Sequence, residues 1–143
     1  MTNRQLFVPG VPAPQGSKRH VGNGVLVESS KRLRPWRATV TAAIVEAGWA
    51  HDPILAGPVH VAVQFDLPRP AYHYGTGRNA GVLKSRAPLW HDKRGDVDKL
   101  SRAVLDALTE AGAIRDDAQV ASLSATKQYA AIPGVQIILR TLR

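Results

Sequence analysis

The sequence predicts a single small α+β domain, spanning residues 1–143, in which two main helices pack on a mixed β-sheet. A length of 143 residues suits one domain, and a hydrophobic content of 44% is sufficient for a core. The predicted elements follow in the order strand, hairpin, helix, strand, long loop, helix, strand and strand. Such a succession is typical of an α+β domain with a mixed sheet.

Four strands and one hairpin are predicted from the alternation of apolar and polar residues and from the turn residues between them. The pair Asn23-Gly24 lies between apolar residues, and both residue types tolerate a positive φ, so a hairpin is expected over residues 21–27. The strands are expected at about residues 5–8, 59–67, 120–130 and 135–139.

The first predicted helix covers about residues 30–48, where apolar residues recur at steps of three and four and Gly48 provides a stop. Positive charge is unfavourable at the start of a helix, because the helix dipole is positive there. A bound phosphate, or simple exposure to water, would relieve the repulsion. The basic residues concerned are Lys31, Arg32, Arg34 and Arg37.

The second predicted helix covers about residues 97–111 and has the clearest apolar stripe in the chain. Asp96 is a good N-cap residue, and Gly112 is a good C-terminal stop. The preceding loop, residues 71–95, has neither period and is rich in glycine, basic residues and aromatics. A loop of this length is usually functional or disordered, and its aromatic and basic side chains are suited to stacking on unpaired bases.

The composition excludes several kinds of site. The chain has no cysteine, so disulfides, thiolate zinc sites, iron–sulfur clusters and a cysteine nucleophile are excluded. No apolar stretch is long enough to span a membrane and no signal peptide precedes the domain, so we expect a cytoplasmic protein with no membrane partner. Nineteen basic residues against eleven acidic ones give a net charge of +8, which favours a polyanionic partner such as nucleic acid.

Seven of the eleven acidic residues nevertheless fall between Asp92 and Asp117. Asp96 and Asp98 stand at the start of the second helix, and we expect Asp117, which follows the helix and a turn, to return beside them. Three converging carboxylates need a cation between them, and an all-carboxylate site suits Mg²⁺ or Mn²⁺. The alternative is a capping residue, a surface residue and a turn.

A divalent metal in a basic protein indicates phosphodiester hydrolysis, with the basic surface holding the backbone of DNA or RNA. The competing hypothesis is a non-catalytic basic DNA-binding module, in which the acidic residues only cap and solubilise.

The segment from Gly95 to Leu108 (GDVDKLSRAVLDAL), followed by Ala111-Gly112, by DDAQV at 116–120 and by Lys127, resembles the RusA family of Holliday junction resolvases, often carried by bacteriophages and prophages. The resemblance implies a small α+β homodimer that cuts four-way DNA junctions with Mg²⁺ in a bacterial cell. Asp96, Asp98 and Asp117 match the metal-binding aspartates of that family, which makes them the expected catalytic and metal-binding residues.

The sequence departs from the family pattern at two positions. Lys99 stands where the family commonly has asparagine, and Arg102 stands where it has a catalytic-site lysine. Arg102 keeps the charge and is expected to contact phosphate, but arginine stays protonated and is therefore unsuited to proton transfer. The residues expected to contact DNA are Lys18, Arg19, Lys99 and Lys127. Lys127 either also reaches the catalytic site or is an ordinary exposed lysine of the strand.

Overall fold

The computed structural model describes residues 2–16, 18–20, 26–28 and 31–143. Its main feature is a four-stranded mixed sheet in which β4 and β5 are parallel and the other neighbours are antiparallel. The predicted α+β fold with a mixed sheet is confirmed. In spatial order the strands are β1 (Asn3–Pro9), β6 (Gly134–Thr141), β4 (Val59–Leu67) and β5 (Val120–Tyr129).

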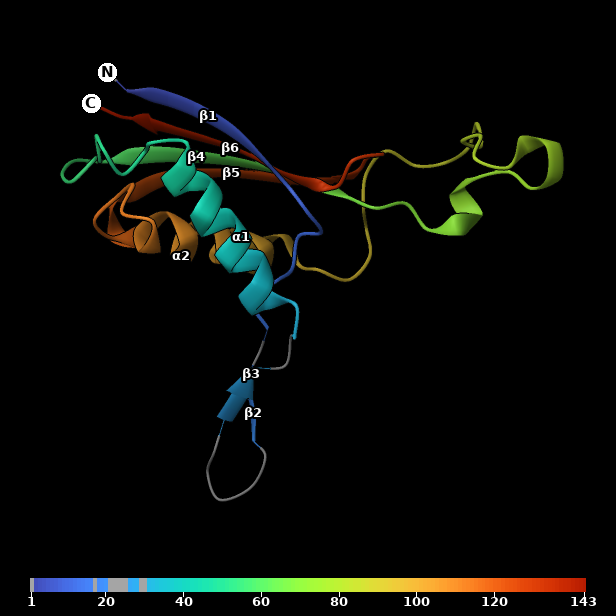
Figure 1. The fold of residues 1–143 in the computed structure, drawn as a ribbon, viewed down its shortest axis with the longest axis horizontal. Coiled ribbons are helices and arrows are strands. Elements are labelled where there is room, and N and C mark those ends of the chain that lie inside the picture. Colours follow the sequence, from blue (N-terminus) through green and yellow to red (C-terminus); the bar gives the residue numbers. More distant parts are fainter. Residues whose placement is uncertain (1, 17, 21–25, 29–30) are drawn as a thin grey trace.

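Helices α1 (Leu33–Glu46) and α2 (Val97–Glu110) cover the same face of this sheet (Figure 1). Helix α2 forms because Leu100, Val104 and Leu108 recur at helical spacing, and all three are fully buried against the sheet and α1. It also connects the parallel strands β4 and β5, which need a long crossover between them. The predicted bounds of the sheet strands and helices agree with the structure to within three residues.

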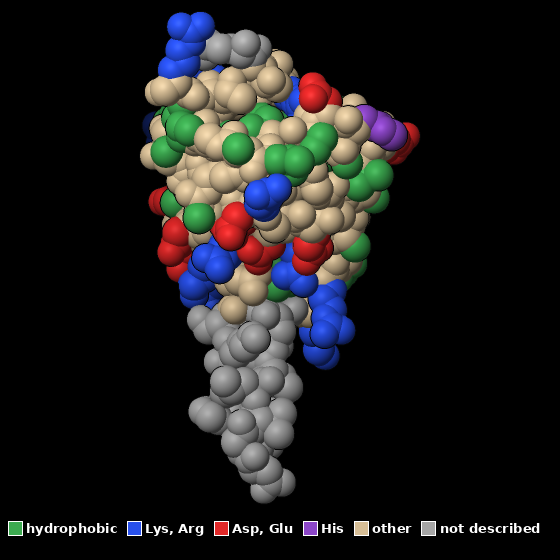
Figure 2. Space-filling model, turned by 90° about the vertical axis from the view of Figure 1, so that its left-hand side faces the viewer, with side chains coloured by type: hydrophobic (Ala, Val, Ile, Leu, Met, Phe, Trp, Pro, Cys, Tyr) green, Lys and Arg blue, Asp and Glu red, His purple; other side chains and the backbone are tan. Residues whose placement is uncertain are grey.

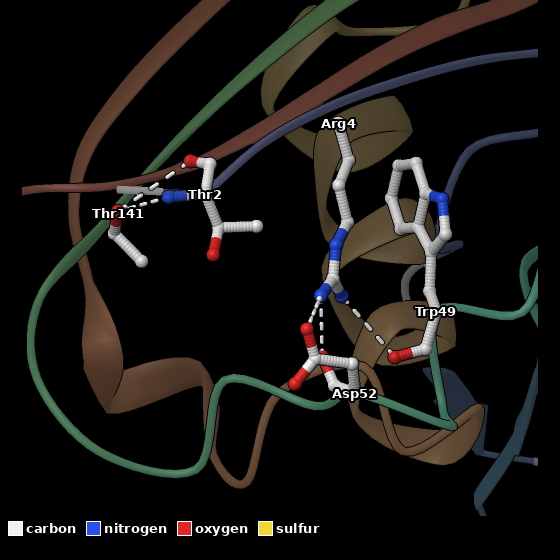
Figure 3. Close-up of polar contacts among 5 residues, drawn as sticks. All are labelled: Thr2, Arg4, Trp49, Asp52 and Thr141. Atoms are coloured by element: carbon white, nitrogen blue, oxygen red, sulfur yellow. Dashed lines mark hydrogen bonds and ion pairs between the residues drawn. The ribbon is translucent and has the colours of Figure 1, made fainter.

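The chain ends are held together at one end of the sheet. The guanidinium of Arg4 on β1 donates to the backbone oxygen of Trp49 and to the carboxylate of Asp52, both at 3.2 Å (Figure 3). The backbone N–H of Thr2 donates to Oγ1 of Thr141 at 2.9 Å. These bonds fix β1 to the turn after α1 and to the end of β6.

A separate pair of short strands lies beyond the start of α1 and apart from the sheet (Figure 1). Strand β2 (Lys18–His20) pairs with β3 (Leu26–Glu28) in antiparallel register. The predicted hairpin is therefore present as a strand pair, while its turn at Asn23-Gly24 lies outside the described residues. Lys18 and Arg19 belong to β2, and their contacts with DNA stay predictions.

Residues 71–95 form an arm that extends beyond the end of the sheet, away from the chain termini (Figure 1). Two short 3₁₀ turns, η1 (Ala71–His73) and η2 (Gly77–Asn79), lie within it. The arm folds back on itself through a bond from Lys84 N–H to the His73 carbonyl, at 2.9 Å. Its last part lies along the outer edge of β5, where Tyr129 N–H donates to the Leu89 carbonyl at 2.8 Å. Among the described residues, no helix is long and apolar enough to cross a membrane.

Candidate active site

Two exposed carboxylates, Asp96 and Asp98, form an acid pair at the start of α2. Asp96 is the N-cap residue, with extended backbone angles, but its side chain makes no capping hydrogen bond. Within the described part of the chain neither carboxylate has a hydrogen-bond or ion-pair partner. The positive end of the helix dipole attracts negative charge at this position. The acid pair is therefore available to a cation or to a ligand that carries one.

The end of β5 supports the backbone that leads into the acid pair. The ammonium of Lys127 donates to the carbonyl of Lys93 at 2.6 Å and to the carbonyl of Gly95 at 2.9 Å. Gly95 has a φ of 101°, a value that side chains disfavour, and it turns the arm into the helix. Lys127 therefore holds the last residues before Asp96 in place.

Asp117 lies at the opposite end of α2 from the acid pair. Its Oδ1 accepts a hydrogen bond of 2.6 Å from the hydroxyl of Thr109, in the last turn of the helix. Because a helix rises about 1.5 Å per residue, Thr109 and Asp96 are separated by roughly 20 Å along the axis. The expectation that Asp117 returns beside Asp96 and Asp98 within one protomer is therefore wrong.

The direction of the strand explains this correction. A strand that follows a helix after a short turn begins near the end of that helix, and only its far end returns to the helix start. In β5 the returning residue is Lys127, whereas Asp117 stands just before the strand begins.

The other acidic residues of α2 and of the following turn surround a second site, which we call the acid hollow. It has a volume of about 350 Å³ and lies at the end of the molecule seen in Figure 2, where acidic side chains occur among basic ones. Asp116 is part of the fold, because its carboxylate accepts from Ala118 N–H at 2.9 Å in a capping box with Gln119. The lining residues are Asp106, Thr109, Glu110, Arg115, Asp116 and Asp117.

Asp106 is an acidic residue of the hollow that lies within ion-pair distance of two arginines. Its carboxylate lies 3.4 Å from Nε of Arg102 and 3.9 Å from Nη1 of Arg37. Burial raises the pKa of Asp106, and the nearby charges of Asp117 and Glu110 raise it further, while the two arginines oppose the rise. Through its contact with Arg37, Asp106 links helix α1 to the acid hollow.

Arg102 lies between the acid pair and the acid hollow. It is one helical turn after Asp98 and one turn before Asp106, and the ion pair that it forms is with Asp106. Its side chain is 64% exposed, so the guanidinium remains accessible to phosphate. Lys99 stands beside the acid pair, and its carbonyl accepts a hydrogen bond from Gln15 N–H. The DNA contacts of Lys99 and Lys127 stay predictions.

A single protomer does not bring together the predicted metal ligands. In the part of the chain that the structure describes, no group of three or more His, Asp or Glu side chains is placed to hold a metal ion. Thr109, which fixes Asp117, was not predicted from the sequence. Its position in the last turn of the predicted helix, just before the Asp116-Asp117 turn, was the available signal.

Comparison with known proteins identifies the family. The family model described as "Endodeoxyribonuclease RusA" matches residues 9–140, which is nearly the whole chain and includes both acidic groups. No curated protein matches the chain closely enough to count as a relative. The predicted resemblance is confirmed, and the protein belongs to the RusA family of endodeoxyribonucleases.

Proposed function

We propose that the protein is a Mg²⁺-dependent, structure-selective endodeoxyribonuclease that resolves four-way DNA junctions. The observation that carries this proposal is the match of the RusA endodeoxyribonuclease family to almost the entire chain. The exposed acid pair, which has no partner among the described residues and lies at the junction of α2 and a basic arm, supports it from the geometry. Two cuts related by symmetry across a junction also require two sites, which a homodimer supplies.

The positions of the acidic residues suggest how a homodimer would complete the site. Asp96 and Asp98 stand at one end of α2, and Asp117 stands at the other. A two-fold axis that pairs the α2 helices in antiparallel fashion would set the acid pair of one protomer against the acid hollow of its partner. Mg²⁺, when bound there, would neutralise charge that develops on the phosphate and acidify a water molecule.

In this arrangement the protein's own residues have separate roles. Asp96, Asp98 and Asp117 supply the carboxylate oxygens that Mg²⁺ or Mn²⁺ prefers. Arg102, exposed in the middle of α2, contacts the scissile phosphate and stabilises its negative charge, because it stays protonated and presents a planar fork of donors.

Mixing two inactive variants tests this function and the shared site. Asp96→Asn and Asp117→Asn should each abolish nicking of a labelled junction in Mg²⁺ while leaving junction binding intact. Heterodimers of the two variants, obtained by co-expression with different tags, should regain nicking. One of their two sites then contains only aspartates, and the other contains both substitutions. Glu46→Gln, at an exposed position on α1, is the matched control and should stay fully active.

Other outcomes would overturn parts of the proposal. Inactive heterodimers would contradict the site shared between protomers, and full nicking by either single variant would remove that aspartate from the site. Cleavage of linear duplex as fast as the junction would indicate a general nuclease. Salt-sensitive binding without any Mg²⁺-dependent cleavage would favour a non-catalytic DNA-binding module.

A further inference from the structure

The base of the arm contains a pocket that the acid pair and the acid hollow do not include. This arm pocket has a volume of about 310 Å³, within the usual size of small-ligand sites. An adjoining hollow of about 340 Å³ shares Tyr72, Lys93 and Tyr129 with it. The residues of the arm pocket used below are Tyr72, His73, Lys84, Arg86, Lys93 and Tyr129.

The floor of the arm pocket is aromatic. The rings of His73 and Tyr129 are both only 4% exposed, and they meet edge to face with centroids 4.7 Å apart. The ring of Tyr72 packs edge to face on His73 at 4.9 Å, yet this residue is 62% exposed. Tyr72 therefore offers a ring to a flat ligand, and the buried rings beneath hold it in position.

The polar groups of the site suit a nucleotide. Burial lowers the pKa of His73, and Arg69 donates to its Nδ1 at 3.2 Å, so the neutral ring has Nε2–H as its donor. A ring N–H of this type is a donor of the kind that bonds to the edge of a base.

The rim of the arm pocket is cationic. Lys84, Arg86 and Lys93 line it, against a single acidic residue, Asp92, which lies 3.6 Å from Lys93. Within the described residues, Lys84 and Arg86 form no ion pair with protein carboxylates, although both are exposed. Positive charge around an aromatic floor is the combination that binds single-stranded nucleic acid.

The arm pocket is preformed, and β5 connects it to the start of α2. The backbone hydrogen bond between Lys84 and His73 fixes the part of the pocket formed by the arm. The backbone hydrogen bond between Leu89 and Tyr129 fixes the arm to β5. Tyr129 stands two residues after Lys127 on β5, and Lys127 binds the carbonyl of Gly95, the residue before Asp96. A strand therefore joins the floor of the pocket directly to the start of α2.

We propose that the arm pocket binds one unstacked nucleotide of the DNA substrate, with its base on Tyr72 and its flanking phosphates on Lys84, Arg86 and Lys93. This inference rests on the proposed function and adds a nucleotide site to it. A base extruded from the centre of a junction would be held here, and the backbone next to it would reach the acid pair. Capture of a strained, unpaired base also favours branched DNA over linear duplex, because unstacking costs least there.

The test measures binding in EDTA, so that it does not depend on catalysis. The probes are a fluorescein-labelled four-way junction and a short labelled oligothymidylate. Tyr72→Ala should weaken binding of both about tenfold or more, whereas Tyr72→Phe should retain it, because stacking needs only the ring. Trp90→Ala is the matched control. Trp90 is 60% exposed on the same arm, but it lines neither the arm pocket nor the hollow that adjoins it.

A second readout locates the base. With 5-iododeoxyuridine at the crossover, ultraviolet crosslinking followed by mass spectrometry should recover Tyr72 or Tyr129. Equal losses for Tyr72→Ala and Trp90→Ala, or crosslinks only to residues outside the pocket, would overturn the proposal. A failure of the proposed nuclease function gives a different result. The protein would then bind oligothymidylate through Tyr72 without cutting a junction, so the nucleotide site would stand and only the nuclease function would be refuted.

Discussion

At the residue scale, Asp106 shows how burial and neighbouring charge compete at one carboxylate. Its side chain is 25% exposed, lies among both acidic and basic groups, and has a pKa raised above the usual 3.8, with burial as the first cause. In the folded protein it keeps its proton to a higher pH than in the unfolded chain. Across the interval between the two pKa values the folded state binds more protons, so the free energy of unfolding falls as pH rises.

Replacing Asp106 by asparagine should remove this pH-dependent loss. The free energy of unfolding of Asp106→Asn minus that of the unaltered protein is expected to become more positive from about pH 4 upward, and to level off above the raised pKa. Urea denaturation in EDTA at several pH values measures this difference. Glu46→Gln controls for the loss of one negative charge. If this difference in the free energy of unfolding stays constant or falls as pH rises, the pKa of Asp106 is not raised in the folded protein.

At the element scale, α2 and β5 form one functional unit because they run in opposite directions. The sequence predicted both elements, and Asp96 as the N-cap residue, from local spacing that does not depend on the rest of the fold. The position of Asp117 was misjudged, because the turn that follows α2 stands at the end of the helix and only the far part of β5 returns to the helix start. The hydroxyl of Thr109 settles that question by holding Asp117 at the end of α2.

Lys127 should act as a positioning residue for the acid pair. Lys127→Met keeps the length of the side chain but loses the bonds to the carbonyls of Lys93 and Gly95. We expect a loss of about 1–2 kcal/mol in the free energy of unfolding, because the bonds are charge-assisted but partly exposed. Junction cleavage should fall about tenfold or more, since small displacements of reacting groups have large effects on rate.

Junction affinity in EDTA separates positioning from direct contact with DNA. If Lys127 only positions the helix start, Lys127→Met binds the junction as well as the unaltered protein does. A parallel loss of affinity would assign it the DNA contact that the sequence predicted. Arg78→Met is the control. It removes an exposed cation of the arm, and Arg78 lines neither the arm pocket nor the hollow that adjoins it.

At the scale of the whole molecule, the basic residues divide into those that hold the fold together and those that remain exposed. Arg37, one of four basic residues near the start of α1, lies 3.4 Å from Glu110 and 3.9 Å from Asp106, so it joins the two helices. The sequence could not distinguish it from its neighbours, because its partners are about 70 residues away. The three that stay exposed are Lys31, Arg32 and Arg34.

These three cations should contribute to DNA binding through phosphate contacts. A protein that neutralises phosphates releases condensed counterions, and the logarithm of its affinity falls with the logarithm of salt concentration by about 0.9 per contact. Substituting Lys31, Arg32 and Arg34 together by alanine should therefore make the slope for junction binding shallower by about 2–3. Anisotropy titrations between about 50 and 200 mM salt measure it, and Arg37 is left in place to keep the helices joined. If the slope is unchanged, the start of α1 faces only water, and the DNA path runs along α2 and the arm alone.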